Sequence, residues 1–543
     1  MVMYDRRNEL IHKRVLIVDD YSEFRYSVKK MLQSFGMTDI DDVGDGDDAI
    51  ERMSLKPYDI VLCDYNLGEG KRDGQQILEE AKHRELLRYN SMFIMITAEN
   101  TMAMVMGAME YKPDDYLTKP FTKDALKNRL DKILERKKEF EPIEKAVYHK
   151  DFLTAINLCN ERINNKPRNI FDYLRWKADL CVTVGDYDEA KKIYEDVLVI
   201  RKLQWATLGL GKIYFLKGQY VDAIPLFQDL ISENKTLMEA YDWLSKSYEE
   251  SGASNEAQKT LMNASEISPK AILRQKTLAQ IALKNKDIGT AEKSLKAAVD
   301  LGKKSCFKTP SDYTSLAKIY IEKKKPEKAL DILGDSRGTF TNSPEANLQA
   351  AVVEGLAYRE MGNTEAAQNA LDEASQIFDF VKGSVSAEVS MDVAKSFFAL
   401  GDADKGNKLM ENIIKNNHDN EKVIKMAEEV FKDANMQEEG QKMITETKQE
   451  IVRINNDGVA LVQKGRLKDA IEYFEKAASG LPENKIINAN AAQANIMYMQ
   501  KYGKNENLML QTRTYLEQIR KVDPSYEKYQ NLLFTYQKIV NKP

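Results

Sequence analysis

Three carboxylates follow two apolar runs near the start of the chain. Asp19 and Asp20 come directly after Val15–Val18, and Asp64 comes directly after Ile60–Cys63. Carboxylates that gather in one place repel one another, and a hard divalent cation with oxygen ligands normally offsets this repulsion. The sequence therefore predicts a Mg²⁺ site, provided that the fold brings the two run ends together.

A hydroxyl group and an ammonium group hold comparable places farther along the chain. Thr97 follows the run Met92–Ile96, and Lys119 comes shortly after the weaker run Asp115–Leu117. An aspartate beside a bound Mg²⁺, with a hydroxyl and an ammonium group opposite, has the groups needed to receive a phosphoryl group. The cation and the lysine would stabilise the charge on the transferring oxygens, so these residue types indicate phosphoryl-group chemistry.

The elements that must position these side chains alternate between strand and helix. The two runs that end in acid have the length and β-branched residues of buried parallel strands, and the runs at Met92 and Asp115 follow as a third strand and a weaker fourth. Helical stretches such as Glu23–Phe35 and Gln75–Arg88 lie between the runs. This alternation predicts an α/β doubly wound sheet, in which functional sites form outside the carboxyl ends of the strands. The three carboxylates, the hydroxyl and the ammonium group all fall at that edge.

Residues 12–138 resemble the receiver domain of two-component response regulators. The likeness is carried by the acidic pair, the acid that ends an apolar strand, Thr97-Ala98, the aromatic Tyr116 and Lys119-Pro120, in the family's order and at its spacing. It implies a flavodoxin-like strand order for this part of the chain.

The resemblance also implies what each residue does. Asp64 is the phosphoacceptor, Thr97 bonds a phosphoryl oxygen, and Lys119 pairs with the same group. Tyr116 is the aromatic side chain that changes rotamer when Thr97 moves towards the phosphate. Asp20 and Asp64 hold Mg²⁺ with their carboxylates, Asp19 acts through the shell of the ion, and Asn66 supplies its backbone carbonyl.

The loop that follows Asp64 departs from the family pattern. The family usually runs through a short turn with a proline to Asp-Gly, whereas residues 65–74 contain no proline and form a loop about two residues longer. The acceptor and its ligands are unchanged. The expected effect is therefore on the lifetime of the phosphorylated state and on the fit to a kinase.

The chain beyond residue 140 is periodic. The stretch Leu210–Phe227 carries the Leu-Gly, Tyr, Ala and Phe positions of a tetratricopeptide repeat, and the pattern returns near Gly458. Small residues recur where two helices must approach closely. The turn position of the repeat recurs at eight places: Lys150, Gly185, Gly218, Gly252, Lys286, Lys324, Gly362 and Gly401.

We therefore predict a phosphoacceptor receiver domain over residues 1–140 and an all-α tetratricopeptide superhelix over residues 141–543. The array should contain about nine or ten helix pairs, with an irregular stretch near residues 405–450. A charged helix, Lys123–Glu139, joins the two parts, and Pro142 predicts that a new helix starts there. Ligand contacts are expected from polar side chains on the first helix of each pair.

The composition narrows the classes of partner. Lys and Arg total 80 against 85 for Asp and Glu, and no basic block offers the charge that nucleic acid binding needs. No run of about 18 apolar residues occurs, so membrane insertion is not expected. The four cysteines lie far apart in the sequence, which fits a reducing compartment. These features predict a soluble cytoplasmic protein.

The prediction for function is a response regulator that has neither a DNA-binding nor an enzymatic output domain. Phosphorylation of Asp64 would control protein–protein binding by the array. The resemblance implies a sensor histidine kinase or a phosphotransfer protein as phosphodonor and a protein or peptide ligand on the array, and it allows a homodimer. Two alternatives stay open: a static interaction scaffold or phosphate sink, and a Mg²⁺-dependent hydrolase. Against the second, Asp64-Tyr65-Asn66 lacks the second acid of a D-x-D pair.

Overall fold

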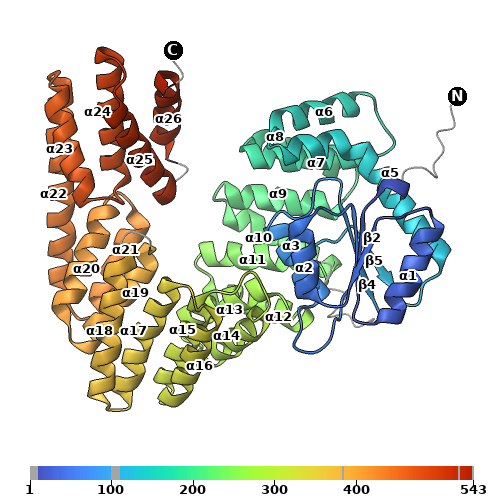
Figure 1. Cartoon of the computed structure of the whole chain (residues 1–543), viewed down its shortest axis with the longest axis horizontal. Coiled ribbons are helices and arrows are strands. Elements are labelled where there is room, and N and C mark those ends of the chain that lie inside the picture. The colour runs from blue at the N-terminus through green and yellow to red at the C-terminus, as the bar shows by residue number, and fades with distance from the viewer. Residues whose placement is uncertain (1–9, 99–109, 382–384, 524–525, 541–543) are drawn as a thin grey trace. The chain divides into compact units, whose positions relative to one another are not determined.

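The computed structural model describes residues 10–98, 110–381, 385–523 and 526–540. The chain forms two compact units, Met1–Asp312 and Tyr313–Pro543. The first unit contains an N-terminal α/β domain together with the first helices of a long helical array, and the second contains the rest of the array (Figure 1). None of the helices in the described residues is both long and apolar enough to cross a membrane.

Five parallel strands form the sheet of the α/β domain in the order β2-β1-β3-β4-β5. The strand order reverses between β1 and β3, whose last paired residues are Val18 and Cys63. This topology is the predicted doubly wound, flavodoxin-like sheet, and the reversal is where such sheets place their sites. The strands are β1 (Val15–Val18), β2 (Ile40–Val43), β3 (Ile60–Asp64), β4 (Met92–Thr97) and β5 (Asp115–Thr118).

The edge strand β2 was not among the strands that the apolar runs predict. Its sequence is Ile-Asp-Asp-Val, and only Ile40 and Val43 are buried, so it lacks the continuous apolar run of a central strand. One helix is also shorter than predicted. The stretch expected to be helical over Gln75–Arg88 forms α3 (Gly74–His83), because the chain turns at Arg84 and Glu85 takes a left-handed φ of 54°.

Helices cover both faces of the sheet. Helices α1 (Ser22–Ser34) and α5 (Lys123–Tyr148) pack on one face, and α2 (Gly46–Leu55) and α3 pack on the other. Alternate residues of each strand supply the two cores, because successive side chains of a strand point to opposite faces. In β1, for example, Ile17 belongs to the first core and Leu16 to the second. A short 3-10 helix, Leu10–His12, precedes β1.

Helix α5 runs without a break from the α/β domain into the array. We predicted a new helix at Pro142, and this is wrong, since the helix continues to Tyr148. Proline cannot donate the usual backbone hydrogen bond, which disfavours it inside a helix. The burial of apolar side chains along the helix before and after Pro142 offsets that cost. Phe140 and Ile143 pack among array residues, and Leu126 and Leu130 pack in the core of the α/β domain.

The array in the first unit continues with helices that pack in antiparallel pairs: α6 (Phe152–Asn164), α7 (Ile170–Val184), α8 (Tyr187–Ile200), α9 (Gln204–Leu216), α10 (Tyr220–Glu233), α11 (Met238–Glu250), α12 (Ser254–Ile267), α13 (Ile272–Lys284) and α14 (Ile288–Gly302). Helix α15 (Pro310–Glu322) begins the part that leads into the second unit. The remaining helices are α16 (Pro326–Thr339), α17 (Pro344–Glu360), α18 (Thr364–Val381), α19 (Ala387–Leu400), α20 (Ala403–Asn416), α21 (Glu421–Asp433), α22 (Gln437–Gln463), α23 (Leu467–Gly480), α24 (Lys485–Tyr502), α25 (Glu506–Val522) and α26 (Glu527–Val540).

The predicted turn positions share one backbone conformation. All eight have a left-handed φ, between 59° at Lys286 and 89° at Gly401. Glycine adopts this conformation at no steric cost, which explains why it occupies five of the eight positions. In the irregular stretch near residues 405–450, Asn435 makes the same turn with a φ of 58° and leads into the 27-residue helix α22.

Glycine also allows close helix packing at Gly211 in α9. A Cβ atom there would lie 2.6 Å from the ring of Phe227 in α10. We therefore expect Gly211→Ala to destabilise the protein by about 1–3 kcal/mol, because two packed helices would have to separate. Thermal unfolding followed by circular dichroism should show a lower melting temperature.

Gly334→Ala is the matched control for this prediction. Gly334 lies inside α16, and a Cβ atom at this position would have no other atom within 4 Å, so the extra methyl group meets open space. Alanine favours a helix over glycine by up to about 1 kcal/mol, so this variant should melt at the same temperature or higher. A Gly211→Ala protein that melts like the wild type would contradict the close packing.

Candidate functional site

Three carboxylates meet at the point where the strand order reverses. Asp19 follows β1 and is buried, Asp64 ends β3 and is 7% exposed, and Asp20 is exposed to solvent. Each of the three offers an oxygen, and these oxygens lie within 4.8 Å of one another. The two apolar runs thus bring their acids together as parallel neighbouring strands must.

Lys119 joins two of these acids. Its Nζ donates hydrogen bonds to Asp19 Oδ2 at 2.6 Å and to Asp64 Oδ2 at 2.7 Å. The same ammonium group lies 4.1 Å from the centre of the Phe24 ring. Burial lowers the pKa of Lys119, but the hydrogen bonds and charges of the two aspartates outweigh it, so the pKa is raised and the lysine stays charged.

Burial has the opposite consequence for the acceptor candidate. It raises the pKa of Asp64, although the hydrogen bond and charge of Lys119 act to lower it. The bond to Lys119 fixes the orientation of the Asp64 carboxylate. Because Lys119 is shared with Asp19, it compensates only part of the negative charge. The donor set of three carboxylates, without thiolate or imidazole in the cluster, suits a hard cation such as Mg²⁺.

The start of α1 and the start of α3 hold the acids in position. The backbone N–H of Tyr21 donates to Asp19 Oδ1 at 2.9 Å, and Arg25 donates to the Asp19 carbonyl at 2.6 Å. Gly74 opens α3 against the acceptor, where a Cβ atom would lie 2.3 Å from the Asp64 carbonyl oxygen. A larger residue at position 74 would push the loop away from the site.

The other predicted site residues lie around this cluster. Thr97 ends β4, is buried, and its carbonyl accepts the N–H of Lys119 at 2.7 Å. Asn66 lies two residues beyond Asp64, and its side chain accepts the N–H of Gly68. Tyr116 lies on β5, half-buried against the core that α2 and α3 cover. The structure therefore brings four of the predicted residues directly together: Asp19, Asp20, Asp64 and Lys119. The other three lie on the neighbouring strands and loops.

Sequence reasoning missed the side chains of the array that contact the loop after Asp64. Lys270, between α12 and α13, lies 3.7 Å from Asp73 Oδ2 and 5.0 Å from the centre of the Tyr65 ring. In α3, Gln76 donates to the Leu301 carbonyl at 3.2 Å, and the buried Glu79 accepts a hydrogen bond from Ser305. Only the burial of polar residues on α3 hints at these contacts, and burial is not readable from a local pattern.

Comparison with known proteins gives two matches to protein families. Residues 15–131 match the response regulator receiver domain, and residues 456–479 match the tetratricopeptide repeat. Over 123 residues the chain is 33% identical to the chemotaxis protein CheY-3 of Vibrio cholerae serotype O1, a match that covers 23% of this chain and 92% of that protein. The chain belongs to the response regulator family.

A second relative and a solved structure each match a similar share of this response regulator. The chemotaxis protein CheY of Pseudomonas aeruginosa is 30% identical over 123 residues, which are 23% of this chain and 97% of that protein. Among solved structures, the BeF3-activated DrrB receiver domain shares 25% identity, covers 23% of this chain and 97% of its own, and has a TM-score of 0.20. By the two family matches, a receiver domain and a tetratricopeptide repeat are both present in one chain.

Proposed function

We propose that this response regulator is phosphorylated on Asp64 and that the phosphorylated state controls which protein the repeat array binds. The receiver domain covers residues 1–140 and the array residues 141–543, with α5 crossing the boundary. The phosphodonor is a sensor histidine kinase or a phosphotransfer protein. The array takes a protein or peptide ligand, and neither nucleic acid nor a separate enzymatic output belongs to the proposal.

The single observation that carries the proposal is the joint position of three carboxylates and Lys119 in a receiver domain. In the transfer, an Asp64 oxygen forms a bond to phosphorus while the bond from phosphorus to the donor nitrogen breaks, and the imidazole leaves. Asp19, Asp20, Asp64 and Asn66 would hold Mg²⁺, which when bound neutralises charge on the phosphoryl oxygens. Lys119 and Thr97 would then bond phosphoryl oxygens, and Tyr116 would respond to the position of Thr97.

The contacts between the receiver domain and the array favour control over a static scaffold. Lys270 lies beside the loop that follows the acceptor, and the α3 contacts join the receiver to the segment around residues 301–306. A phosphoryl group adds negative charge next to this loop and would attract or displace the charged groups around it. Side chains of the array therefore lie beside the loop that begins at the proposed acceptor.

Hydrogen exchange on the full chain, with and without a small phosphodonor such as acetyl phosphate, tests this control. We expect phosphorylation to change backbone protection in residues 65–83 and 265–309, since these segments are in contact, and to leave helices α21 to α23 unchanged. Asp64→Ala is the control and should show no change with the donor. Identical protection in the phosphorylated and unphosphorylated wild type would favour the static scaffold.

A further inference from the structure

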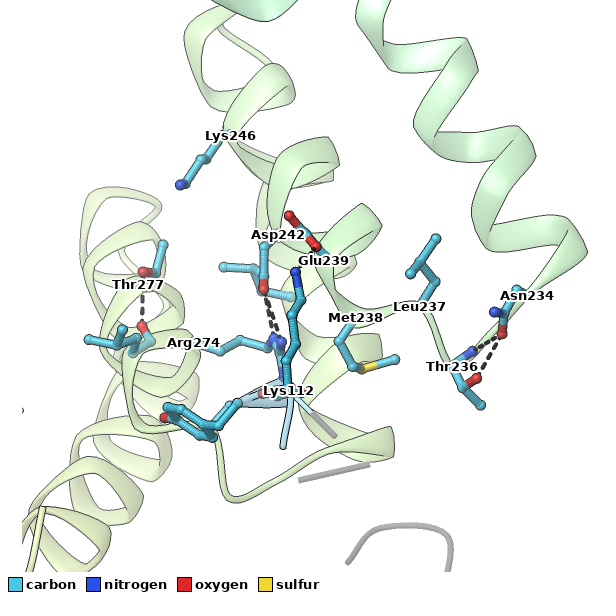
Figure 2. Close-up of a pocket in the computed structure, with 15 residues that line it drawn as sticks. Lys112, Asn234, Thr236, Leu237, Met238, Glu239, Asp242, Lys246, Arg274 and Thr277 are labelled. Atoms are coloured by element: carbon cyan, nitrogen blue, oxygen red, sulfur yellow. Dashed lines mark hydrogen bonds and ion pairs between the residues drawn. The ribbon is translucent and has the colours of Figure 1, made fainter. Parts of the chain in front are cut away.

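A hollow lined by both charged and apolar side chains lies in the first unit beside the receiver residues that precede β5. Its volume is about 560 Å³, and the first helices of two neighbouring repeats, α11 and α13, contribute to its wall (Figure 2). Glu110 and Lys112 of the receiver domain line the same hollow. Polar side chains on first helices are where ligand contacts of the array were expected.

Two ion pairs join the receiver domain to the array in this hollow. Glu110 accepts a hydrogen bond from Arg274 Nη1 at 2.8 Å. Two residues farther on, the Lys112 ammonium group donates to Glu239 Oε2 at 3.1 Å. The receiver thus presents an acid and a base, spaced two residues apart, to a matching base and acid on α13 and α11.

Other residues of the array hold Arg274 and Glu239 in position. Arg274 donates to both oxygens of Asp242, from Nε at 2.8 Å and from Nη2 at 3.0 Å, and its side chain is only 3% exposed. Figure 2 shows these two bonds as dashed lines between α13 and α11. Glu239 likewise accepts a hydrogen bond from Lys212 of α9. If the receiver segment leaves, Glu239 keeps Lys212 as a partner, and Arg274 keeps Asp242 and, at 3.4 Å from Nη1, the Ser268 carbonyl. The Nη1 that bonded Glu110 can then donate to a new carboxylate.

An interaction that is pre-oriented on one side costs less entropy to form with a new partner. The fork of a guanidinium group also suits a carboxylate better than a neutral group. Lys112 loses little when it returns to solvent, because its side chain is already 68% exposed. The Glu110 side chain is 16% exposed, and its bond to Arg274 is the contact that a partner carboxylate would replace. A partner segment with the same two charges would re-form both ion pairs that the receiver segment gives up.

We propose that this hollow is the partner-binding site of the array, that it takes a protein segment with a glutamate two residues before a lysine, and that Glu110 and Lys112 occupy it as an internal competitor. The partner carboxylate bonds Arg274, and the partner ammonium group bonds Glu239. This inference rests on the proposed function in one respect: phosphorylation would act by changing how often the receiver segment leaves the hollow.

Fluorescence polarisation with a labelled peptide of the sequence of residues 107–115 tests the proposal on the full chain without a phosphodonor. Glu110→Gln keeps the shape of the internal competitor but removes its charge, so the peptide should bind about tenfold more tightly than to the wild type, equivalent to about 1.4 kcal/mol. The matched control is Asp131→Asn, the same kind of change on α5 outside the hollow, and it should bind like the wild type.

Two further arms make the test specific. Adding Arg274→Gln to Glu110→Gln should abolish binding; if that protein fails to fold by circular dichroism, Glu239→Gln in the same background replaces it, with the same expected loss of affinity. A peptide with the glutamate and the lysine exchanged should bind at least about tenfold more weakly, because both contacts become repulsive.

Equal affinity of the peptide for wild type and Glu110→Gln, or equal binding of the exchanged peptide, would overturn the proposed site. Neither result would touch phosphorylation control, which the hydrogen-exchange experiment tests separately. Conversely, tight charge-dependent binding that a phosphodonor leaves unchanged would support the site and count against the control.

Discussion

Asp64→Ala should abolish phosphoryl labelling of the protein by acetyl phosphate or by a phosphorylated donor protein. Asp64 is largely buried, bonded to Lys119 and grouped with Asp19 and Asp20. Asp19 shares Lys119, but its other oxygen already accepts the backbone N–H of Tyr21, so we assign the acceptor role to Asp64. The label on the wild type should be an acyl phosphate, which hydrolyses in alkali and reacts with hydroxylamine. Radiolabel incorporation followed by hydroxylamine treatment measures both properties.

Asp48→Asn is the matched control, because Asp48 is an exposed acid on α2 with no part in the cluster. It should label like the wild type. A stable label that persists in Asp64→Ala would indicate an ester on a serine or threonine, and the assignment of the acceptor would then be wrong.

Removal of divalent cations should abolish the same labelling, and restoring Mg²⁺ should recover it. The phosphoryl group carries several negative charges into a site that already holds three carboxylates, and Lys119 alone cannot compensate them. Labelling in the presence and absence of a chelator measures the dependence. Labelling at the full rate in the chelator would contradict a metal role.

Isothermal titration calorimetry can test whether Asp20 is one of the Mg²⁺ ligands. Asp20→Asn should weaken Mg²⁺ binding at least about tenfold, since the number of charged ligands strongly affects the affinity of such sites. Asp48→Asn again serves as the control and should bind Mg²⁺ like the wild type. The full chain is the proper sample, because a cut at residue 140 would divide α5. Unchanged affinity in Asp20→Asn would remove it from the ligand set.

The strand ends of the receiver domain were predictable because its central strands are continuous apolar runs. Each run ends at a polar residue, and parallel neighbours must bring those ends to one edge, which places Asp19 beside Asp64. The turns of the array were predictable for a similar reason. A left-handed φ favours glycine, and the repeat period carries the position forward to Lys150, Lys286 and Lys324, where glycine is absent.

Other features have no local signal. Strand β2 is an edge strand with two acids in its centre, so its burial pattern comes from a single neighbour, β1. The helix through Pro142 depends on apolar contacts made with later helices. The pairing of Glu110 with Arg274 joins residues 164 positions apart in the sequence. Such contacts follow from the three-dimensional arrangement and leave no periodicity in the chain.

The unbroken helix α5 makes its own length a determinant of how the receiver domain works. Each residue added to an α-helix turns the chain beyond it by about 100° and advances that chain by about 1.5 Å. An insertion of one residue near Pro142 would therefore rotate the receiver away from Lys270 and Arg274, whatever the residue inserted. A flexible tether would absorb such a change. In this family member, receiver domains could be exchanged by recombination only where the helical phase is kept, so the number of residues between Lys123 and Tyr148 should vary far less than their identity.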